Sequence, residues 1–221
     1  SHDPTAILIP CSSIPAVAAA VESGRADQGV LPIENSLEGS VTFTLDLLIH
    51  ESGLFVRNEL VLPIRHCLMA KPGARAEDIE VIYSHPQAMA QCRAFLSDRF
   101  PDAHLAASLS TSAAVEEMQE SEAVAAAIAN ERSAMLYGAE ILEKGVEDNP
   151  NNETRFVVLA TSDHPFTGAD KTSICFDFDE DAPGILYTVL GEIATRGINL
   201  AKIESRPTRQ SLGRYIFLVD L

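Results

Sequence analysis

The chain contains few aromatic side chains and few basic ones. Tryptophan is absent from its 221 residues, and aromatic residues make up only 6% of them. A hydrophobic core must therefore rely on alanine, valine, isoleucine and leucine, and a hydrophobic content of 46% is ample for one. At this length we expect one large domain or two small ones.

Basic residues are outnumbered two to one. The chain has 16 lysines and arginines against 32 aspartates and glutamates, which gives a net charge of −16. This charge argues against nucleic acid as a partner, because phosphate binding needs a basic face. It argues against a negatively charged membrane surface for the same reason. The plain interpretation of the acidity is solubility, so any bound anion must meet positive charge that is concentrated locally.

Cysteine and long apolar runs are also scarce. The four cysteines, Cys11, Cys67, Cys92 and Cys175, are widely spaced and form no CxxC pair. We therefore expect buried free thiols rather than disulfides or a metal site. No apolar run is long enough to span a bilayer, and no signal peptide is visible. These absences predict a protein of the reducing cytoplasm with no metal and no membrane partner.

Two successive blocks of the chain show alternating strand and helix patterns. The first begins with an apolar run at residues 6–9, which we expect to be a buried strand, and has a second strand at 28–33. The second includes a strand at 81–83 and a helix at 86–100. Such alternation predicts a mostly parallel sheet with helices on both faces, and two blocks predict two lobes.

The pattern changes after residues 162–170, whose composition is typical of a linker. A strand at 172–178, a helix at 185–195 and strands at 198–205 and 215–221 follow. This β-α-β-β order is typical of a ferredoxin-like module, although the module's final helix and strand are missing.

Three polar clusters lie beside short strands in the first part of the chain. They are Glu34-Asn35-Ser36, Ser84-His85-Pro86-Gln87 and Asn152-Glu153-Thr154-Arg155-Phe156. In α/β proteins, strand ends and the loops that follow them hold small ligands. We therefore expect the three clusters to share one cleft.

Together these clusters resemble the signatures of prephenate dehydratase. Residues 29–36, with Gly39, Val41, Thr44 and Asp46, resemble the first signature, residues 84–92 the second and residues 152–156 the third. Downstream, residues 184–187 and 204–207 resemble the paired effector signatures of the ACT domain that regulates this enzyme. The first of these reads Gly-Ile-Leu-Tyr, where the family more often has Gly-Ala-Leu-Val. The family's opening glycine-rich loop is not seen.

The resemblance implies an α/β fold with a two-lobed, periplasmic-binding-protein-like catalytic domain at residues 1–162, whose second lobe covers about 65–145. It also implies a ferredoxin-like ACT domain, truncated at its C-terminus, at residues 170–221. Through this family the chain is expected to form a homodimer or homotetramer.

The reaction implied is the conversion of prephenate to phenylpyruvate with loss of water and carbon dioxide. The ring receives the electrons left by decarboxylation, so no cofactor is required. The resemblance assigns catalysis to Thr154, Arg155 and Phe156. Thr154 would donate a hydrogen bond to the leaving hydroxyl, and Arg155 would offer a forked donor to a carboxylate.

Substrate binding is assigned by the same resemblance to seven further residues: Glu34, Asn35, Ser36, Thr44, Ser84, His85 and Gln87. Helix N-termini near Ser84 and near Thr44 are expected to stabilise the dianion. Plainer interpretations stay open, since these residues are also typical of turns and helix caps, and Arg155 of an ion pair with a structural carboxylate.

L-Phenylalanine is the effector that the ACT resemblance implies. Its pocket would be lined by Gly184, Ile185, Leu186, Tyr187, Asn199 and Leu200, with Glu204, Ser205 and Arg206 at its polar end. Two rival functions remain open at this stage. An arogenate dehydratase would use the same chemistry on an amino analogue, and a non-catalytic amino-acid sensor would use the two-lobed plan for binding alone.

Overall fold

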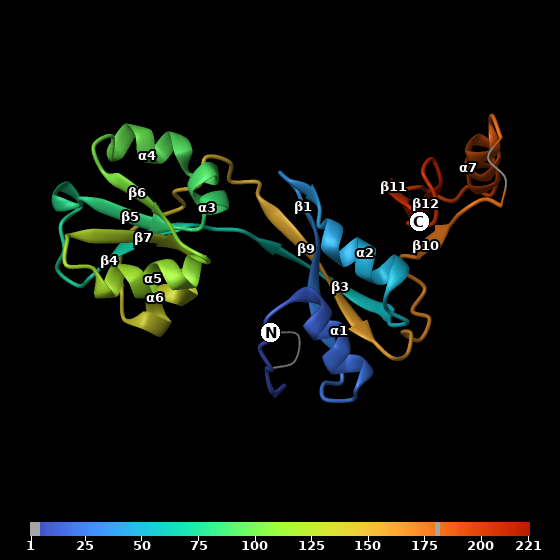
Figure 1. The fold of residues 1–221 in the computed structure, drawn as a ribbon, viewed down its shortest axis with the longest axis horizontal. Coiled ribbons are helices and arrows are strands. Elements are labelled where there is room, and N and C mark those ends of the chain that lie inside the picture. The colour runs from blue at the N-terminus through green and yellow to red at the C-terminus, as the bar shows by residue number, and fades with distance from the viewer. Residues whose placement is uncertain (1–4, 180–181) are drawn as a thin grey trace. The chain divides into compact units, whose positions relative to one another are not determined.

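The computed structural model describes residues 5–179 and 182–221, which form two compact units (Figure 1). Unit 1 contains residues 5–34, 40–60 and 155–221 of the described chain, and unit 2 contains residues 35–39 and 61–154. The expected second lobe, about 65–145, falls within unit 2. No helix of the described residues is both long enough and apolar enough to cross a bilayer.

Unit 2 is built on a five-stranded sheet with the order β6-β5-β7-β4-β8. Its strands are β4 (Cys67–Ala70), β5 (Val81–Ser84), β6 (His104–Ala107), β7 (Ala125–Ala129) and β8 (Glu140–Lys144). β5 pairs in parallel with β6 and β7, whereas β4 pairs antiparallel with β7 and β8.

The expectation of a mostly parallel sheet is therefore wrong for unit 2, because two of its four strand pairings are antiparallel. Only a short 3₁₀ helix, Ala76–Asp78, lies between β4 and β5, and a parallel connection normally needs a longer crossover with a full helix. β4 accordingly enters the sheet in the opposite direction to its neighbour β7.

Helices cover both faces of this sheet, as the alternation predicts. α3 (Pro86–Gln91) and α4 (Arg93–Arg99) lie on one face, and α5 (Thr111–Glu120) and α6 (Glu131–Tyr137) on the other (Figure 1). Ile82, Cys92 and Leu96 pack in the first core, and Val115 and Met118 in the second. The central strand β7 is buried on both sides and consists of alanines and one isoleucine, which allows close helix packing.

The single helix expected at residues 86–100 is divided at Cys92, where φ and ψ are −116° and 21°. The Asp148 carboxylate accepts from the backbone N–H of Ala94 at 3.0 Å and of Phe95 at 3.3 Å. This cap stabilises a new helix start at α4. The segment therefore forms two short helices, α3 and α4, in place of one.

Unit 1 contains most of the four-stranded sheet β2-β1-β9-β3, together with α1 and α2. The elements are α1 (Ile14–Glu22), β1 (Gly29–Asn35), β2 (Gly39–Ser40), α2 (Thr42–His50), β3 (Phe55–Pro63) and β9 (Glu153–Ala160). Leu31, Leu45 and Leu159 belong to its core. The strand expected at residues 6–9 is wrong, since this segment pairs with no strand and Ile7 is 91% exposed.

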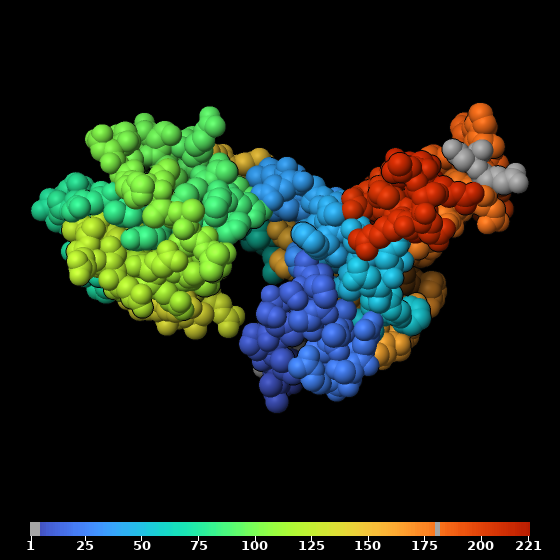
Figure 2. All heavy atoms as spheres, in the orientation of Figure 1, coloured from blue at the N-terminus to red at the C-terminus, as the bar shows by residue number. Residues whose placement is uncertain are grey.

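The C-terminal module, residues 173–220 as described, completes unit 1. It contains β10 (Ser173–Phe176), α7 (Ile185–Thr195), β11 (Lys202–Pro207) and β12 (Tyr215–Asp220), and its antiparallel sheet has the order β10-β12-β11. The helix has the bounds that the sequence predicts. Leu218 packs against the core of the first sheet, and Figure 2 shows the C-terminal residues, in red, against α2, in light blue.

Candidate functional site

Unit 2 contains a cavity of about 380 Å³ that gathers residues from distant parts of the chain. Four of the predicted site residues line it: Asn35, His85, Gln87 and Thr154. Asn35 ends β1, His85 precedes α3 and Thr154 lies at the start of β9. Strand ends and a helix start therefore meet at one hollow, while the roles of these residues stay a prediction.

Asn35 and Thr154 are hydrogen-bonded although they are 119 positions apart. Asn35 Nδ2 donates to Thr154 Oγ1 at 2.9 Å and to Asn152 Oδ1 at 2.8 Å. Asn35 Oδ1 accepts from the backbone N–H of Leu37 at 2.9 Å and of Glu38 at 3.2 Å. Because a backbone N–H can only donate, these bonds fix the orientation of the amide.

The Thr154 hydroxyl is therefore an acceptor toward Asn35. The residue is 8% exposed, and no group among the described residues of unit 2 accepts its own proton. A hydroxyl that accepts one hydrogen bond keeps its proton for another oxygen. Thr154 can accordingly donate to a molecule that occupies the cavity.

Two glutamines of α3 face the same cavity. Gln87 and Gln91 are four residues apart and hence on one face of the helix. The Nε2 atoms of both donate to the carboxylate of Glu38, and the bond from Gln91 is 2.9 Å long. The two amides thus already hold a carboxylate, which shows what kind of group they can bind.

Three other predicted residues of unit 2 make structural contacts. Ser84 is fully buried, and its Oγ donates to the carbonyl of Ile128 on β7 at 2.7 Å. His85 caps α3, because its Nδ1 accepts from the backbone N–H of Gln87 at 3.3 Å. Ser36 Oγ donates to the carbonyl of Asn151 at 3.0 Å. The contacts of His85 and Ser36 match the plainer interpretations as cap and turn residues, whereas Ser84 ends β5 and does not cap α3.

Arg155 follows Thr154 directly but points to the opposite face of β9, since successive side chains of a strand alternate. Its guanidinium is within 2.8 Å of Asp220, 3.0 Å of Glu34 and 3.4 Å of Glu59. Burial lowers the pKa of Arg155, but the hydrogen bond to Asp220 and the three carboxylates raise it overall. The role of Arg155 toward a substrate carboxylate stays a prediction, and Glu34 pairs with it rather than lining the cavity.

Two further predicted residues also belong to unit 1. Thr44 is fully buried in α2, and its hydroxyl donates to the carbonyl of Pro32 at 2.6 Å. Phe156 is half-buried on β9. Neither residue lines the cavity of unit 2.

The predicted effector residues lie on α7, on the segment that follows it and on β11. Gly184 precedes α7 with φ 84°, Tyr187 is 80% exposed, and Ile185, Leu186 and Leu200 are half-buried while Asn199 is exposed. On β11 the exposure alternates, so Glu204 and Ser205 point to opposite faces. A ligand on one face of this sheet would therefore reach only one of these two side chains.

Glu204 and Arg206 contact the rest of unit 1. Glu204 accepts from the hydroxyl of Ser40, and Arg206 donates twice to Asp46 at 3.0 and 2.8 Å. Burial raises the pKa of the Asp46 carboxyl, but hydrogen bonds from Arg206 and Arg209 bring it below its usual value. The face of β11 that carries these residues is thus held by α2 and β2.

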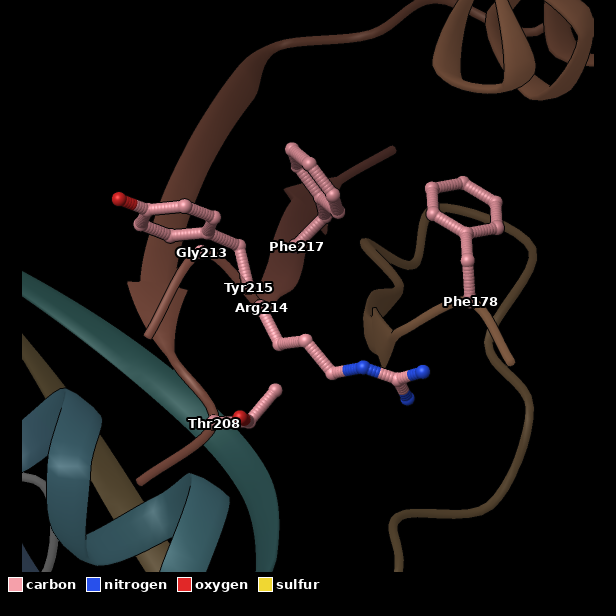
Figure 3. A pocket seen from close by; sticks show the side chains of 6 residues that line it. All are labelled: Phe178, Thr208, Gly213, Arg214, Tyr215 and Phe217. Atoms are coloured by element: carbon pink, nitrogen blue, oxygen red, sulfur yellow. The ribbon is translucent and has the colours of Figure 1, made fainter. Parts of the chain in front are cut away.

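A smaller hollow of about 60 Å³ lies in the C-terminal module, where Arg214 extends between Thr208 and Phe178 (Figure 3). Arg214 Nη2 donates to the carbonyl of Asp179 at 2.8 Å. None of the predicted effector residues lines this hollow.

Several residues of the main cavity were not predicted from the sequence. They are Ile64, His66, Ala88, Gln91, Leu109, Ser110 and Thr111. Gln91 is detectable because it lies one turn after Gln87. Ser110 caps α5 by accepting from Ala113 N at 3.0 Å, so the unpaired N–H groups of a ten-residue helix begin at the cavity. Nothing in the sequence around His66 indicates its position.

The cysteines are free, and only Cys67 and Cys92 are buried. Burial raises the pKa of the Cys92 thiol to about 12, so it stays protonated at neutral pH. The expectation of buried thiols is wrong for Cys175, which is exposed. Among the described residues, no three His, Cys, Asp or Glu side chains are grouped to hold a metal ion.

Two family profiles match the chain. The profile described as prephenate dehydratase matches residues 2–164, and the ACT domain profile matches residues 180–221. A bifunctional chorismate mutase/prephenate dehydratase from Aquifex aeolicus is 44% identical over 213 residues, which are 96% of this chain. The match spans 58% of the Aquifex protein, so the chain corresponds to little more than half of that relative.

Solved structures are similar too. The prephenate dehydratase of Arthrobacter aurescens in complex with L-Phe is 39% identical, with a TM-score of 0.86 over 96% of this chain and 71% of that one. A protein described as GqqA, a novel type of quorum quenching acylase, is 34% identical, with a TM-score of 0.83 over 98% of this chain and 78% of that one. The expected α/β fold class with a C-terminal ACT domain is confirmed. On these matches, the chain belongs to the prephenate dehydratase family.

Proposed function

We propose that this chain catalyses the decarboxylating dehydration of prephenate to phenylpyruvate. The observation that carries the proposal is the hydrogen bond from Asn35 to Thr154 at the wall of a cavity, because it leaves the threonine proton available. Family membership supports the same reaction. The chain corresponds to only part of its relatives, so the activity of the whole protein is a proposal.

The first task of the enzyme is to hold a dianion. The amide groups of Gln87 and Gln91 are suited to this task, since they already bind the carboxylate of Glu38. The N-terminus of α5 at Ser110 and Thr111 adds backbone N–H groups and the positive end of a helix dipole. The N-terminus of α5 thus supplies positive potential locally in a chain whose net charge is −16.

The second task is to assist the departing hydroxyl. The bond between the ring and its carboxylate breaks and releases carbon dioxide, and its electron pair enters the ring. The ring–oxygen bond breaks, and the oxygen leaves with its electrons and takes up one proton to become water. A threonine hydroxyl is a poor acid near neutral pH, so Thr154 acts as an oriented hydrogen-bond donor to that oxygen. Asn35 holds it in place.

L-Phenylalanine regulates the proposed enzyme through the C-terminal module. The ACT profile at residues 180–221 and the L-Phe complex of the Arthrobacter relative support this part of the proposal. The effector residues are those of α7, of the segment that follows it and of β11 given above, and the active assembly is a homodimer or homotetramer. Regulation requires that L-phenylalanine bind two states of the protein with different affinities.

The test is a turnover assay with three substrates. We expect phenylpyruvate to form from prephenate, a lower kcat/KM on arogenate, and a lower rate when L-phenylalanine is present. Thr154→Ala should keep the fold and KM but reduce kcat by on the order of 10²–10³. An acylase substrate serves as the control, because one structural relative is an acylase. Binding of amino acids without turnover of prephenate would instead indicate a sensor.

A further inference from the structure

His66 is a buried histidine in the wall of the cavity to which the proposed reaction assigns no task. It is 6% exposed. Its backbone N–H donates to the Glu147 carboxylate at 2.8 Å, and its carbonyl accepts from Gly145 N at 2.9 Å and Val146 N at 3.1 Å. The backbone is thus held on both sides, and the ring is presented from a fixed position.

Among the described residues, the side chain of His66 has one polar partner. Its Nε2 lies 2.8 Å from Gln91 Oε1. Gln91 Nε2 donates to Glu38, which as a carboxylate can only accept, so the oxygen of Gln91 must be the atom that faces the histidine. His66 Nε2 therefore carries the proton and donates it to Gln91.

The other ring nitrogen supports this assignment. Nδ1 is buried and has no partner among the described residues. A proton on Nδ1 would be a buried donor with no acceptor, which is costly, whereas a bare Nδ1 leaves only an unused lone pair. These contacts consequently assign the proton of the ring to Nε2 and leave Nδ1 bare.

A continuous chain of hydrogen bonds leads from this ring to the hydroxyl that the proposed function uses. Gln91 Oε1 also accepts from Asn152 Nδ2 at 3.1 Å, and Asn152 Oδ1 accepts from Asn35 Nδ2 at 2.8 Å. Asn35 Nδ2 then donates to Thr154 Oγ1 at 2.9 Å. Every donor and acceptor along the chain is assigned, and Asn152 is fully buried.

We infer that His66 is a positioning residue for the proposed reaction. Its Nε2–H holds the oxygen end of Gln91, whose other end is held by Glu38, and the bonds through Asn152 and Asn35 pass this constraint on to the Thr154 hydroxyl. This inference rests on the proposed function, because Thr154 acts on the leaving oxygen only there. A histidine that merely filled space would make no use of Nε2.

Two variants distinguish the roles of the two ring nitrogens. In His66→Gln, the side-chain NH₂ group reaches about as far as Nε2 and can still donate to Gln91. In His66→Asn, it reaches only about as far as Nδ1. We expect His66→Asn to lose about 3- to 10-fold in kcat with KM within about twofold of wild type, as for one lost hydrogen bond. His66→Gln should keep at least half of the wild-type kcat.

A double-variant comparison tests the route. If His66 acts through Gln91, then adding His66→Asn to Gln91→Met should reduce kcat no further. Additive losses would overturn the inference. So would equal losses in His66→Gln and His66→Asn, or an unchanged kcat in His66→Asn. The thermal unfolding midpoint of each variant shows whether it is folded.

A nitrogen-15 NMR spectrum of the wild-type protein tests the position of the His66 proton without any variant. We expect the Nε2 signal of His66 in the range of a protonated ring nitrogen and the Nδ1 signal in the range of an unprotonated one. A proton on Nδ1 would overturn the inference even if all variants precipitate. If the wild type does not turn over prephenate, the proposed function fails, whereas the tautomer can still be measured.

Discussion

Asn35→Asp is the substitution that most sharply tests the orientation of the Thr154 hydroxyl. The change keeps the shape of the side chain and keeps its acceptor toward Leu37 N and Glu38 N. It replaces the donor Nδ2 by an oxygen, however. In the wild type that atom donates to Thr154 Oγ1 at 2.9 Å, to Asn152 Oδ1 at 2.8 Å and to the Glu153 carbonyl at 3.2 Å.

The new carboxylate can recover only one of these contacts easily. The Thr154 hydroxyl would turn to donate to it, and its proton would then be lost to the substrate. We expect kcat to fall by on the order of 10²–10³, as for loss of a donor to developing negative charge. Asn35→Ala removes the positioning bond but leaves the threonine proton free. We expect it to lose only about 3- to 10-fold, as for one hydrogen bond.

Asn35→Asp should therefore have a lower kcat than Asn35→Ala, although aspartate resembles asparagine more closely than alanine does. Burial raises the pKa of the introduced carboxyl, and its protonated form is present below that pKa and can donate as the amide does. The kcat of Asn35→Asp, relative to wild type at each pH, should consequently rise as the pH falls, while that of Asn35→Ala should not. Steady-state rates on prephenate provide the measurement. The reasoning is refuted if Asn35→Asp is the more active variant at neutral pH.

The remaining predictions concern Glu38, Asp220 and L-phenylalanine. Glu38→Gln removes a negative charge beside the amides of Gln87 and Gln91, so KM for the dianion should fall about 3- to 10-fold in steady-state kinetics, and an increase would count against carboxylate binding there. Asp220→Asn removes a partly buried partner of Arg155, so the free energy of unfolding at pH 7 in urea should fall by about 1 kcal/mol, and no change would contradict a structural ion pair. Burial raises the pKa of the Asp220 carboxyl, but hydrogen bonds from Ser173 and Arg155 bring it below its usual value of 3.8. The stabilisation by this carboxylate is therefore present above pH 3.8 and is lost as the pH falls through the lowered pKa of the folded protein. The wild type should accordingly lose more stability below about pH 4 than Asp220→Asn. L-Phenylalanine should release heat on binding and lower the rate over the same concentration range, and heat without a change in rate would remove its regulatory role.

The sequence predicts the elements whose cause is local. The helix Ile185–Thr195 is bounded by glycines and carries a regular apolar face, and its bounds were predicted correctly. Ser13 caps α1 in the same local way, because a cap and the apolar run after it are adjacent in the chain. The order of strands and helices in the C-terminal module follows in the same way.

Features that depend on distant partners were not predicted. β8 has the sequence Glu-Ile-Leu-Glu-Lys, which is too polar to indicate a strand, and it forms because β4 offers an edge for pairing. Conversely, residues 6–9 are apolar but have no strand to pair with, so they remain exposed. The break at Cys92 depends on Asp148, which lies more than fifty positions away.

The same distinction between local and distant causes applies to the candidate site. Motifs beside strand ends identified Asn35, Gln87 and Thr154, which line one cavity. No motif of the sequence identifies His66, because its contact with Gln91 spans 25 positions and follows no spacing rule. Alternation along β9 separates Arg155 from Thr154, and the ion pair with Asp220 matches the plainer interpretation of Arg155.

The most direct test of the account compares Thr154→Ser with Thr154→Ala on prephenate. Serine keeps the hydroxyl that Asn35 orients, whereas alanine removes it and little else. We expect kcat of the serine variant to stay within about tenfold of wild type and that of the alanine variant to fall by on the order of 10²–10³, with similar KM and unfolding midpoints. Equal rates for the two variants would show that the hydroxyl takes no part in the reaction.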